Sequence, residues 1–319
     1  MDQHPQSIYE ESWVPGGEDL LRFYTRIYLA RNPLAALIFV HGFTEHISRY
    51  EWAHSLLASR GIIVFAYDQR GFGRTALDTL RRSEHARLGR TSWPALLADM
   101  AHWITSMKAQ YPALPIFAMG HSMARPEIFH YGNSSSDSHP IRGAHFSYIS
   151  LHLARSRRML SGIIASSPFL AQTEPLAKSL RHIVAIASKA LPAILISTEL
   201  PHSYLSRNRD VVATLAKDPL VKQKSSMKFV TEMLDAGEHL IQLEHPSVPC
   251  GLSVLVLHGT ADRITSFTAS KQFFDCLDAR DKTFDAYHEL VHEPYGVREE
   301  YMDRCIDWVL SRAASYHQH

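Results

Sequence analysis

The chain has few cysteines, no long apolar run and no excess of charge of either sign. Three cysteines in 319 residues are too few for a disulfide framework, which favours a reducing compartment. Lys and Arg number 33 against 32 Asp and Glu, so no overall field attracts nucleic acid. No run approaches the roughly 20 apolar residues of a membrane-spanning helix, and residues 1–5 lack the start of a signal peptide. We therefore expect a cytoplasmic protein that does not bind nucleic acid.

What the chain does contain is a series of short apolar runs that end in turn residues. This rhythm is typical of an α/β fold with a mostly parallel central sheet flanked by helices. Residues 93–108 have helical spacing, and 21–30 alternate as an early antiparallel strand does. Further strands are expected over 37–40, 62–67, 116–119, 162–165, 252–257 and 283–287.

The strand rhythm stops between Pro168 and about Pro249, where the sequence is helical and loop-like. We expect residues 169–248 to form a helical cap inserted after the sixth strand, and residues 1–168 and 249–319 to form the core. Residues 176–191 carry apolar side chains at helical spacing. This stripe either packs on the cap's own core or forms an apolar entrance that lies in a membrane interface.

Residues 120–124 read Gly-His-Ser-Met-Ala, which is a nucleophile elbow without its final glycine. Such an elbow places its serine on a cramped turn between a strand and a helix, and flanking glycines let the two backbones approach. Here Ser122 follows a predicted strand, but Ala124 occupies the position of the second glycine. The sequence therefore predicts a serine nucleophile in an altered elbow, although an ordinary strand-end serine is the alternative.

A serine nucleophile needs a base, an acid that orients the base, and donors for the oxyanion. In α/β-hydrolases the acid and the base follow the serine in the sequence, each at the end of a strand. Asp262 and His288 have these positions. Asp262 could instead be a helix N-cap, and His292 competes with His288 as the base. The oxyanion donors are expected to be the backbone N–H groups of Phe43 and Met123.

The residues around His288 also spell His-Glu-x-x-His, a zinc-protease motif. Zinc binding by this motif requires both histidines on one face of a helix. The motif directly follows a predicted strand and meets Pro294 two residues past its end, so a long helix is not expected here. We therefore expect no metal and no other cofactor.

Several motifs together resemble the monoacylglycerol lipase family, especially its fungal members. The resemblance covers nearly the whole chain except about 124–142, and it departs from the family at Thr44, where glycine is frequent, and at Ala124. The motifs are FVHGFTEHISRY (39–50), DQRGFGR (68–74), GHSM (120–123), HGTAD (258–262) and YHEL (287–290), with the cap segments 205–207, 217–220, 233–234 and 237–238.

The resemblance implies an α/β-hydrolase that cleaves a monoacylglycerol to glycerol and a fatty acid without a metal. By that match Ser122 is the nucleophile, Asp262 the acid and His288 the base. Glu45 and Arg49 either line the polar end of the substrate pocket or form an ion pair that holds their loop. The expected partner is a lipid ester, with peripheral contact of the cap to a membrane or lipid droplet. A short-chain esterase or peptidase, or a catalytically impaired protein, are the alternatives.

Residues 124–142 have the opposite character from the motif around them. They contain two prolines, a glycine and a serine cluster, and no apolar period. Removing them joins Met123 to Gly143 and restores a complete Gly-x-Ser-x-Gly followed by near-helical apolar spacing. We interpret 124–142 as an insertion foreign to the working enzyme, most simply a retained in-frame intron. The alternative is a real loop that bulges from the elbow.

Overall fold

The computed structural model describes residues 9–17, 19–123, 159–175, 177–204, 206, 208–243, 246, 248–249, 251–287 and 296–316. Its centre is an eight-stranded sheet with the strand order β1-β2-β4-β3-β5-β6-β9-β10. Only β2 runs antiparallel to its neighbours, and the remaining neighbouring pairs are parallel. The strands are β1 (Tyr9–Gly16), β2 (Leu21–Tyr28), β3 (Ala35–Val40), β4 (Ile62–Tyr67), β5 (Ile116–His121), β6 (Leu160–Ser166), β9 (Ser253–Gly259) and β10 (Lys282–Tyr287).

The predicted strands are all present, with ends that shift by a few residues, so the expected α/β fold is confirmed. Strand β1 was not predicted. Its sequence, Tyr-Glu-Glu-Ser-Trp-Val-Pro-Gly, has no buried apolar run because it lies at the edge of the sheet and most of its side chains remain in contact with solvent. Edge strands carry charges and proline without losing their pairing to the one neighbour they have.

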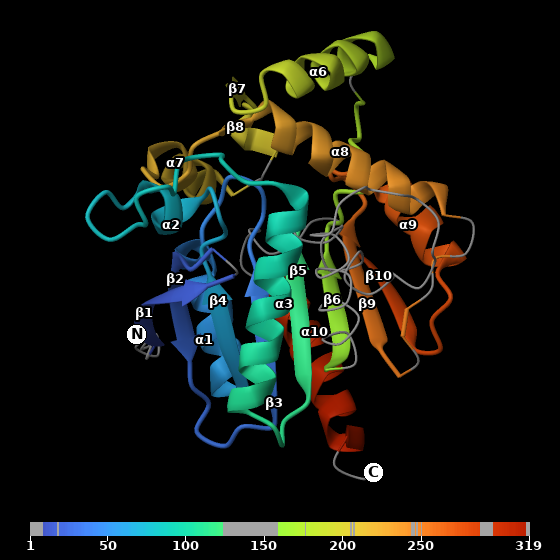
Figure 1. The fold of residues 1–319 in the computed structure, drawn as a ribbon. Coiled ribbons are helices and arrows are strands. Elements are labelled where there is room, and N and C mark those ends of the chain that lie inside the picture. Colours follow the sequence, from blue (N-terminus) through green and yellow to red (C-terminus); the bar gives the residue numbers. More distant parts are fainter. Residues whose placement is uncertain are drawn as a thin grey trace.

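Helices cover both faces of the sheet (Figure 1). On one face α3 (Trp93–Gln110) packs, so that Trp103 shares a buried cluster with Ile38 of β3. On the other face lie α1 (Glu51–Ser59) and α10 (Val297–Tyr316), and there Trp308 shares a cluster with Leu37. Neighbouring residues of β3 thus enter opposite layers, as the two-residue period of a strand requires. Burial of each such side chain stabilises the fold by about 1.5–3 kcal/mol.

The segment between β6 and β9 lies over the carboxyl ends of the parallel strands (Figure 1). We call its elements the cap elements; they confirm the expected helical cap after the sixth strand. They also include an antiparallel ribbon of two short strands, which was not predicted. The cap elements are α6 (Lys178–Ala190), β7 (Leu195–Ser197), η2 (His202–Tyr204), α7 (Arg209–Lys217), β8 (Lys224–Ser226) and α8 (Met227–Gln242).

Several helices begin at a side chain that accepts a backbone N–H, which explains where they start. Ser92 caps α3 by accepting from the Ala95 N–H, and Ser226 caps α8 by accepting from the Phe229 N–H. Ser266 caps α9 (Phe267–Cys276) in the same way. None of the helices within the described ranges is long and apolar enough to cross a membrane.

Helix α8 rests directly on the backbone that follows β6. A Cβ atom on Gly237 would lie 2.4 Å from the carbonyl oxygen of Leu170, closer than real contacts allow. Only glycine therefore permits this approach of the cap to the core. Because Phe169 next to it donates its N–H to the carbonyl of Ser122 (3.3 Å), the same contact brings the cap close to the candidate nucleophile.

The fold contains one buried histidine whose ring nitrogens have no hydrogen-bond partner among the described residues. His54 of α1 is fully buried among the rings of Tyr28, Phe39 and Tyr50. Burial lowers the pKa of His54 to about 3. An unfolded histidine has a pKa of about 6.5, so below this pH the unfolded chain binds a proton that the folded chain does not bind.

We predict that the free energy of unfolding decreases as the pH falls from about 6.5 toward 3, by up to ~1.4 kcal/mol per pH unit from His54 alone. His54→Phe should reduce this slope, measured by urea unfolding at several pH values. The control is His85→Gln, because His85 is exposed. A slope that stays the same in His54→Phe would contradict the prediction.

Candidate active site

Ser122 follows β5 directly and has a left-handed backbone conformation. Its φ of 52° is one that residues other than glycine rarely adopt. Its N–H donates to the carbonyl of Ser166 (3.0 Å), and its own carbonyl accepts from Phe169 (3.3 Å). These bonds tie the turn to the residues that end and follow β6. A strained serine at a strand end is the geometry of a nucleophile elbow; that Ser122 is the nucleophile stays a prediction.

The loop after β3 turns back on itself beside Ser122. The Glu45 N–H donates to the carbonyl of Gly42 (3.3 Å), and the Gly42 N–H donates to Glu45 Oε2 (3.2 Å). A Cβ atom on Gly42 would lie 2.8 Å from Glu45 Oε2 and 3.3 Å from the ring of His121, so a side chain there would displace the Glu45 carboxylate. The loop is therefore held in one shape by its own hydrogen bonds.

Phe43 and Met123 line the same cavity as Ser122, which is where oxyanion donors must lie. Among the described residues neither of their backbone N–H groups has an acceptor. Unpaired donors of this kind are available to a developing negative charge. The residues from Ala124 onward, including the elbow position that lacks glycine, lie outside the described residues.

His41 fixes the start of this loop. Its Nδ1 donates to the Gly42 carbonyl (2.8 Å) while its Nε2 accepts from the Gln69 N–H (2.9 Å). Complete burial lowers the pKa of His41, so the ring is neutral and both nitrogens are used within the protein. His41 is thus a positioning residue rather than a proton carrier.

Asp262 lies in the turn after β9, where its carboxylate is oriented by three hydrogen bonds. Oδ1 accepts from the N–H groups of Ile264 and Thr265 (both 2.8 Å), and Oδ2 accepts from the Thr265 hydroxyl (2.7 Å). The N-cap of the following helix is Ser266. The alternative that Asp262 caps that helix is therefore wrong.

His288 and His292 both lie outside the described residues. Strand β10 ends at Tyr287, which pairs with Gly259 at the end of β9. The Tyr287 carbonyl also accepts from the Thr260 N–H (2.6 Å), in the turn that carries Asp262. The residue before His288 is therefore bonded to the Asp262 turn.

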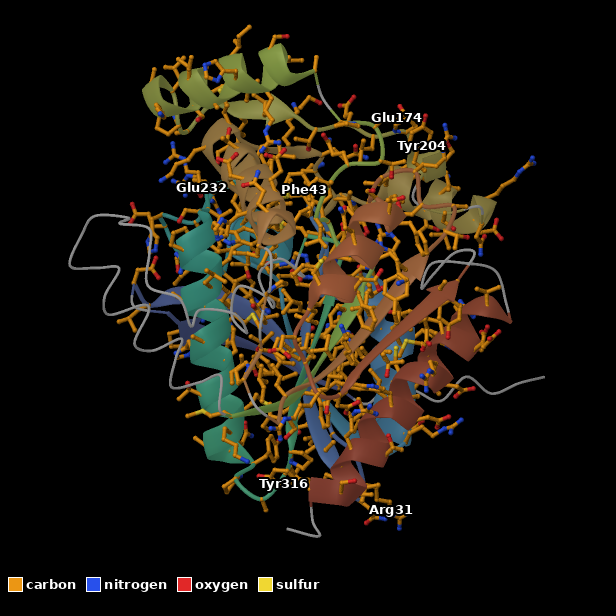
Figure 2. The ribbon with its side chains drawn as sticks, turned by 90° about the vertical axis from the view of Figure 1, so that its right-hand side faces the viewer. Arg31, Phe43, Glu174, Tyr204, Glu232 and Tyr316 are labelled. Atoms are coloured by element: carbon orange, nitrogen blue, oxygen red, sulfur yellow. The ribbon has the colours of Figure 1, made fainter. Side chains whose placement is uncertain are left out.

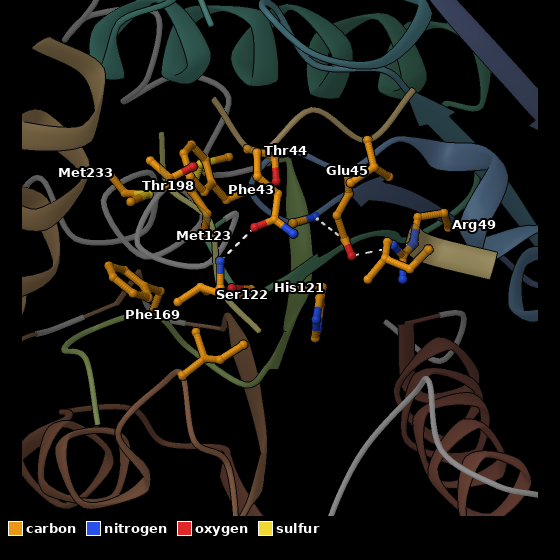
Figure 3. Close-up of a pocket in the computed structure, with 16 residues that line it drawn as sticks. Phe43, Thr44, Glu45, Arg49, His121, Ser122, Met123, Phe169, Thr198 and Met233 are labelled. Carbon is orange, nitrogen blue, oxygen red and sulfur yellow. Dashed lines mark hydrogen bonds and ion pairs between the residues drawn. The ribbon is translucent and has the colours of Figure 1, made fainter. Parts of the chain in front are cut away.

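A cavity with an empty volume of about 680 Å³, which includes open solvent, lies at Ser122 between core and cap. Figure 3 shows Ser122 between two different ends of this cavity. Glu45 and Arg49 lie on one side, and their side chains are 3.5 Å apart. Phe169 and Met233 lie on the other side. The two interpretations of Glu45 and Arg49 are thus compatible, because they line the cavity and also form an ion pair.

Glu45 also accepts a hydrogen bond from the Tyr50 hydroxyl. Complete burial and the neighbouring charge of Glu45 raise the pKa of Tyr50 well above its usual range, so the phenol keeps its proton. The carboxylate is therefore surrounded by donors from Gly42, Arg49 and Tyr50. This set fixes one polar wall of the cavity.

Polar contacts join the cap to the core around the cavity. His46 Nε2 lies 2.8 Å from Asp218 Oδ2, and Arg263 donates to the Tyr204 hydroxyl (2.8 Å). The Trp93 N–H donates to Glu232 of α8 (2.8 Å). Figure 2 shows Glu232 at the start of α3 and Phe43 beneath the cap.

Burial opposes ionisation of Asp218, but the hydrogen bonds from His46 and the Leu220 N–H, together with the charge interactions with His46 and Arg49, leave its pKa lowered. His46 and Asp218 are 172 positions apart. No local pattern in the sequence could have paired them.

Local patterns also could not predict which cap residues line the cavity. These are Thr198, Leu200, Leu215, Val221, Gln223 and Met233.

Within the described ranges no group of three His, Cys, Asp or Glu side chains could hold a metal ion. The His-Glu-x-x-His motif falls outside those ranges.

Comparison with known proteins identifies the family. The model of the serine aminopeptidase S33 family matches residues 31–124 and 145–298, which is more than half of the chain. The chain belongs to this family. The family match stops at 124 and resumes at 145, so it omits nearly the same residues as the insertion inferred from the sequence.

Individual relatives of this chain support its resemblance to monoacylglycerol lipases. A Schizosaccharomyces pombe protein named for monoglyceride lipase is 30% identical over 286 residues, covering 87% of this chain and 68% of that protein. Human monoglyceride lipase is 27% identical over 321 residues, covering 98% and 94%. A Saccharomyces cerevisiae monoglyceride lipase, solved with a substrate analog, superposes with a TM-score of 0.77 at 20% identity, covering 97% and 96%. The last comparison supports the fold, and the first two confirm the predicted family.

Proposed function

We propose that this chain is a serine carboxylester hydrolase that cleaves monoacylglycerols or similar single-chain lipid esters to a fatty acid and glycerol. The observation that carries the proposal is the cavity at Ser122, which has a polar end at Glu45 and Arg49 and an apolar end at Phe169 and Met233. A molecule with a polyol head and a hydrocarbon tail matches both ends. Relatives named as monoglyceride lipases support the same substrate class.

In the proposed reaction, Ser122 Oγ attacks the ester carbonyl carbon while His288 accepts its proton. The oxyanion that forms accepts hydrogen bonds from the Phe43 and Met123 N–H groups. As the carbon–alkoxide bond breaks, glycerol leaves with the proton from His288, and the acyl group stays on Ser122. Water, deprotonated by the same histidine, then releases the fatty acid. Asp262 orients His288, and no cofactor takes part.

A peptidase or short-chain esterase is the second candidate. The name of the matched family, serine aminopeptidase, favours it, and the Glu45 carboxylate at the polar end could bind an amino group as well as a polyol. The fold does not decide between these substrates. A series of monoacylglycerols of increasing chain length, compared with aminoacyl esters, separates the two candidates.

The domain organisation forms part of the proposal, with a core over 1–168 and 249–319 and a cap over 169–248. Residues 124–142 are the foreign segment within the core. The gap in the family match supports this interpretation, because the match continues on both sides of it. If the segment keeps the elbow from closing, the Met123 N–H is misplaced and the chain is catalytically impaired.

The cap also has an exposed apolar face, and we propose that it contacts a membrane or lipid-droplet surface. On α6 the side chains of Leu180, Ile183 and Ile186 are 48%, 62% and 58% exposed. The face continues into Leu191 and Ile194. A stripe that packed on the cap's own core would be covered, so the lipid-contact interpretation is favoured. A cytoplasmic location with peripheral attachment remains a prediction from the sequence.

We predict that a fluorophosphonate probe labels the wild-type chain and does not label Ser122→Ala. The probe reacts with a serine only where a base and oxyanion donors activate it. Ser59→Ala is the control, because Ser59 is an exposed serine at the end of α1. Equal labelling of wild type and Ser122→Ala would refute the assignment.

Removal of residues 124–142 should raise esterase activity at least about a hundredfold, the effect of restoring one oxyanion donor. The measurement is kcat/KM for a monoacylglycerol, with Ser122→Ala in the shortened chain as the control. Equal activity of the two lengths would mean that the elbow closes around the segment. Transcripts that all keep codons 124–142 would exclude the retained intron.

Ile183→Asp should weaken flotation with liposomes without changing the melting temperature, because the Ile183 side chain is 62% exposed. Leu80→Asp is the matched control, because the Leu80 side chain is 93% exposed but lies outside the cap. Unchanged flotation in Ile183→Asp, or equal loss in both variants, would show that this face of the cap does not bind lipid.

A further inference from the structure

Thr44 has a backbone conformation that its side chain disfavours. It is the third residue of the turn that Gly42 begins and Glu45 closes by its N–H to the Gly42 carbonyl. Its φ is 60°, in the left-handed region. Turns with a positive φ at this position favour glycine or asparagine, and a β-branched residue there is an outlier. Glycine at this position would therefore make the fold more stable than threonine does.

The side chain of Thr44 lies where a substrate would be. Thr44 is 8% exposed and lines the cavity that Ser122 also lines. No hydrogen bond joins its hydroxyl to another of the described residues. A hydroxyl that is unpaired and open to a cavity is available to a ligand.

The position of Thr44 within the loop indicates which part of a ligand it meets. It stands between Phe43, the proposed oxyanion donor, and Glu45, at the polar end of the cavity. In a monoacylglycerol the nearest free hydroxyl is separated from the ester oxygen by only two carbon atoms. Thr44, between the proposed oxyanion donor and the polar end, therefore lies in the part of the loop nearest to where that hydroxyl would be.

We propose that Thr44 is a specificity-determining residue whose hydroxyl hydrogen-bonds to a free hydroxyl of the alcohol part of the ester. The proposal rests on the proposed function and deepens it. The backbone at position 44 would favour glycine, and threonine is kept there in spite of the strain because its hydroxyl binds the ligand. Thr44 discriminates polyol esters from esters of simple alcohols and takes no part in bond cleavage.

The test measures binding by calorimetry, so that it does not depend on turnover. The ligands are 1-O-octylglycerol, which has the polyol but no ester, and methyl octyl ether, which has no free hydroxyl. Thr44→Val keeps the shape and removes the hydroxyl, while Thr44→Ser keeps the hydroxyl. We expect Thr44→Val to weaken octylglycerol binding about three- to tenfold, the effect of one hydrogen bond, and to leave the ether unchanged.

Thr44→Ser should bind octylglycerol within about twofold of wild type, and Thr44→Gly should raise the melting temperature as the strain is released. Unchanged octylglycerol binding in Thr44→Val, or an equal loss for both ligands, would overturn the proposed role of Thr44. Either result would leave the proposed substrate class unaffected. A wild-type chain that binds octylglycerol no better than the ether would instead contradict the proposed substrate class, and with it this inference.

Discussion

The hydrogen bond from the Ser122 N–H to the Ser166 carbonyl holds the turn on which the candidate site depends. A residue other than glycine at a φ of 52° costs about 1–3 kcal/mol and persists only where its surroundings fix it. The bond to Ser166 and the bond from Phe169 each offset part of this cost, at about 0.5–1.5 kcal/mol. They also set the separation of β5 and the segment after β6. The cap helix α8 packs on the same segment at Leu170. The segment after β6 therefore contacts both the Ser122 turn and the cap.

The cavity is a product of the core and the cap together. The core supplies Ser122, the Gly42–Glu45 turn and the polar end, and the cap supplies much of the apolar wall. Contacts such as His46 with Asp218 hold the cap over the turn that contains Phe43, the proposed oxyanion donor. A change in the cap would therefore alter both the apolar wall and the loop beside Ser122. This dependence explains why substrate preference cannot be assigned to the core alone.

Much of the fold and part of the site could be predicted from the sequence, because they depend on local patterns. Buried strands such as β4 are continuous apolar runs; Ser122 follows β5 directly, and Asp262 lies in the turn after β9. Strand β1 was not predicted, because an edge strand is largely exposed and its sequence therefore carries no apolar run. The pairing of His46 with Asp218 depends on tertiary contacts between distant segments, which no local spacing encodes. The strain at Thr44 was visible only as a departure from a familiar motif, and its meaning required the backbone angle.

The central claim is that Ser122, Asp262 and His288 act together from the carboxyl ends of β5, β9 and β10, of which β9 and β10 are neighbours. The most direct measurement is kcat/KM for a monoacylglycerol in His288→Ala and in His292→Ala, made in the form of the chain that has the higher activity. The account predicts that His288→Ala abolishes hydrolysis while His292→Ala keeps most of it. The opposite pattern would move the base by four residues and contradict the proposed assignment, and loss of activity on chelation would favour zinc instead.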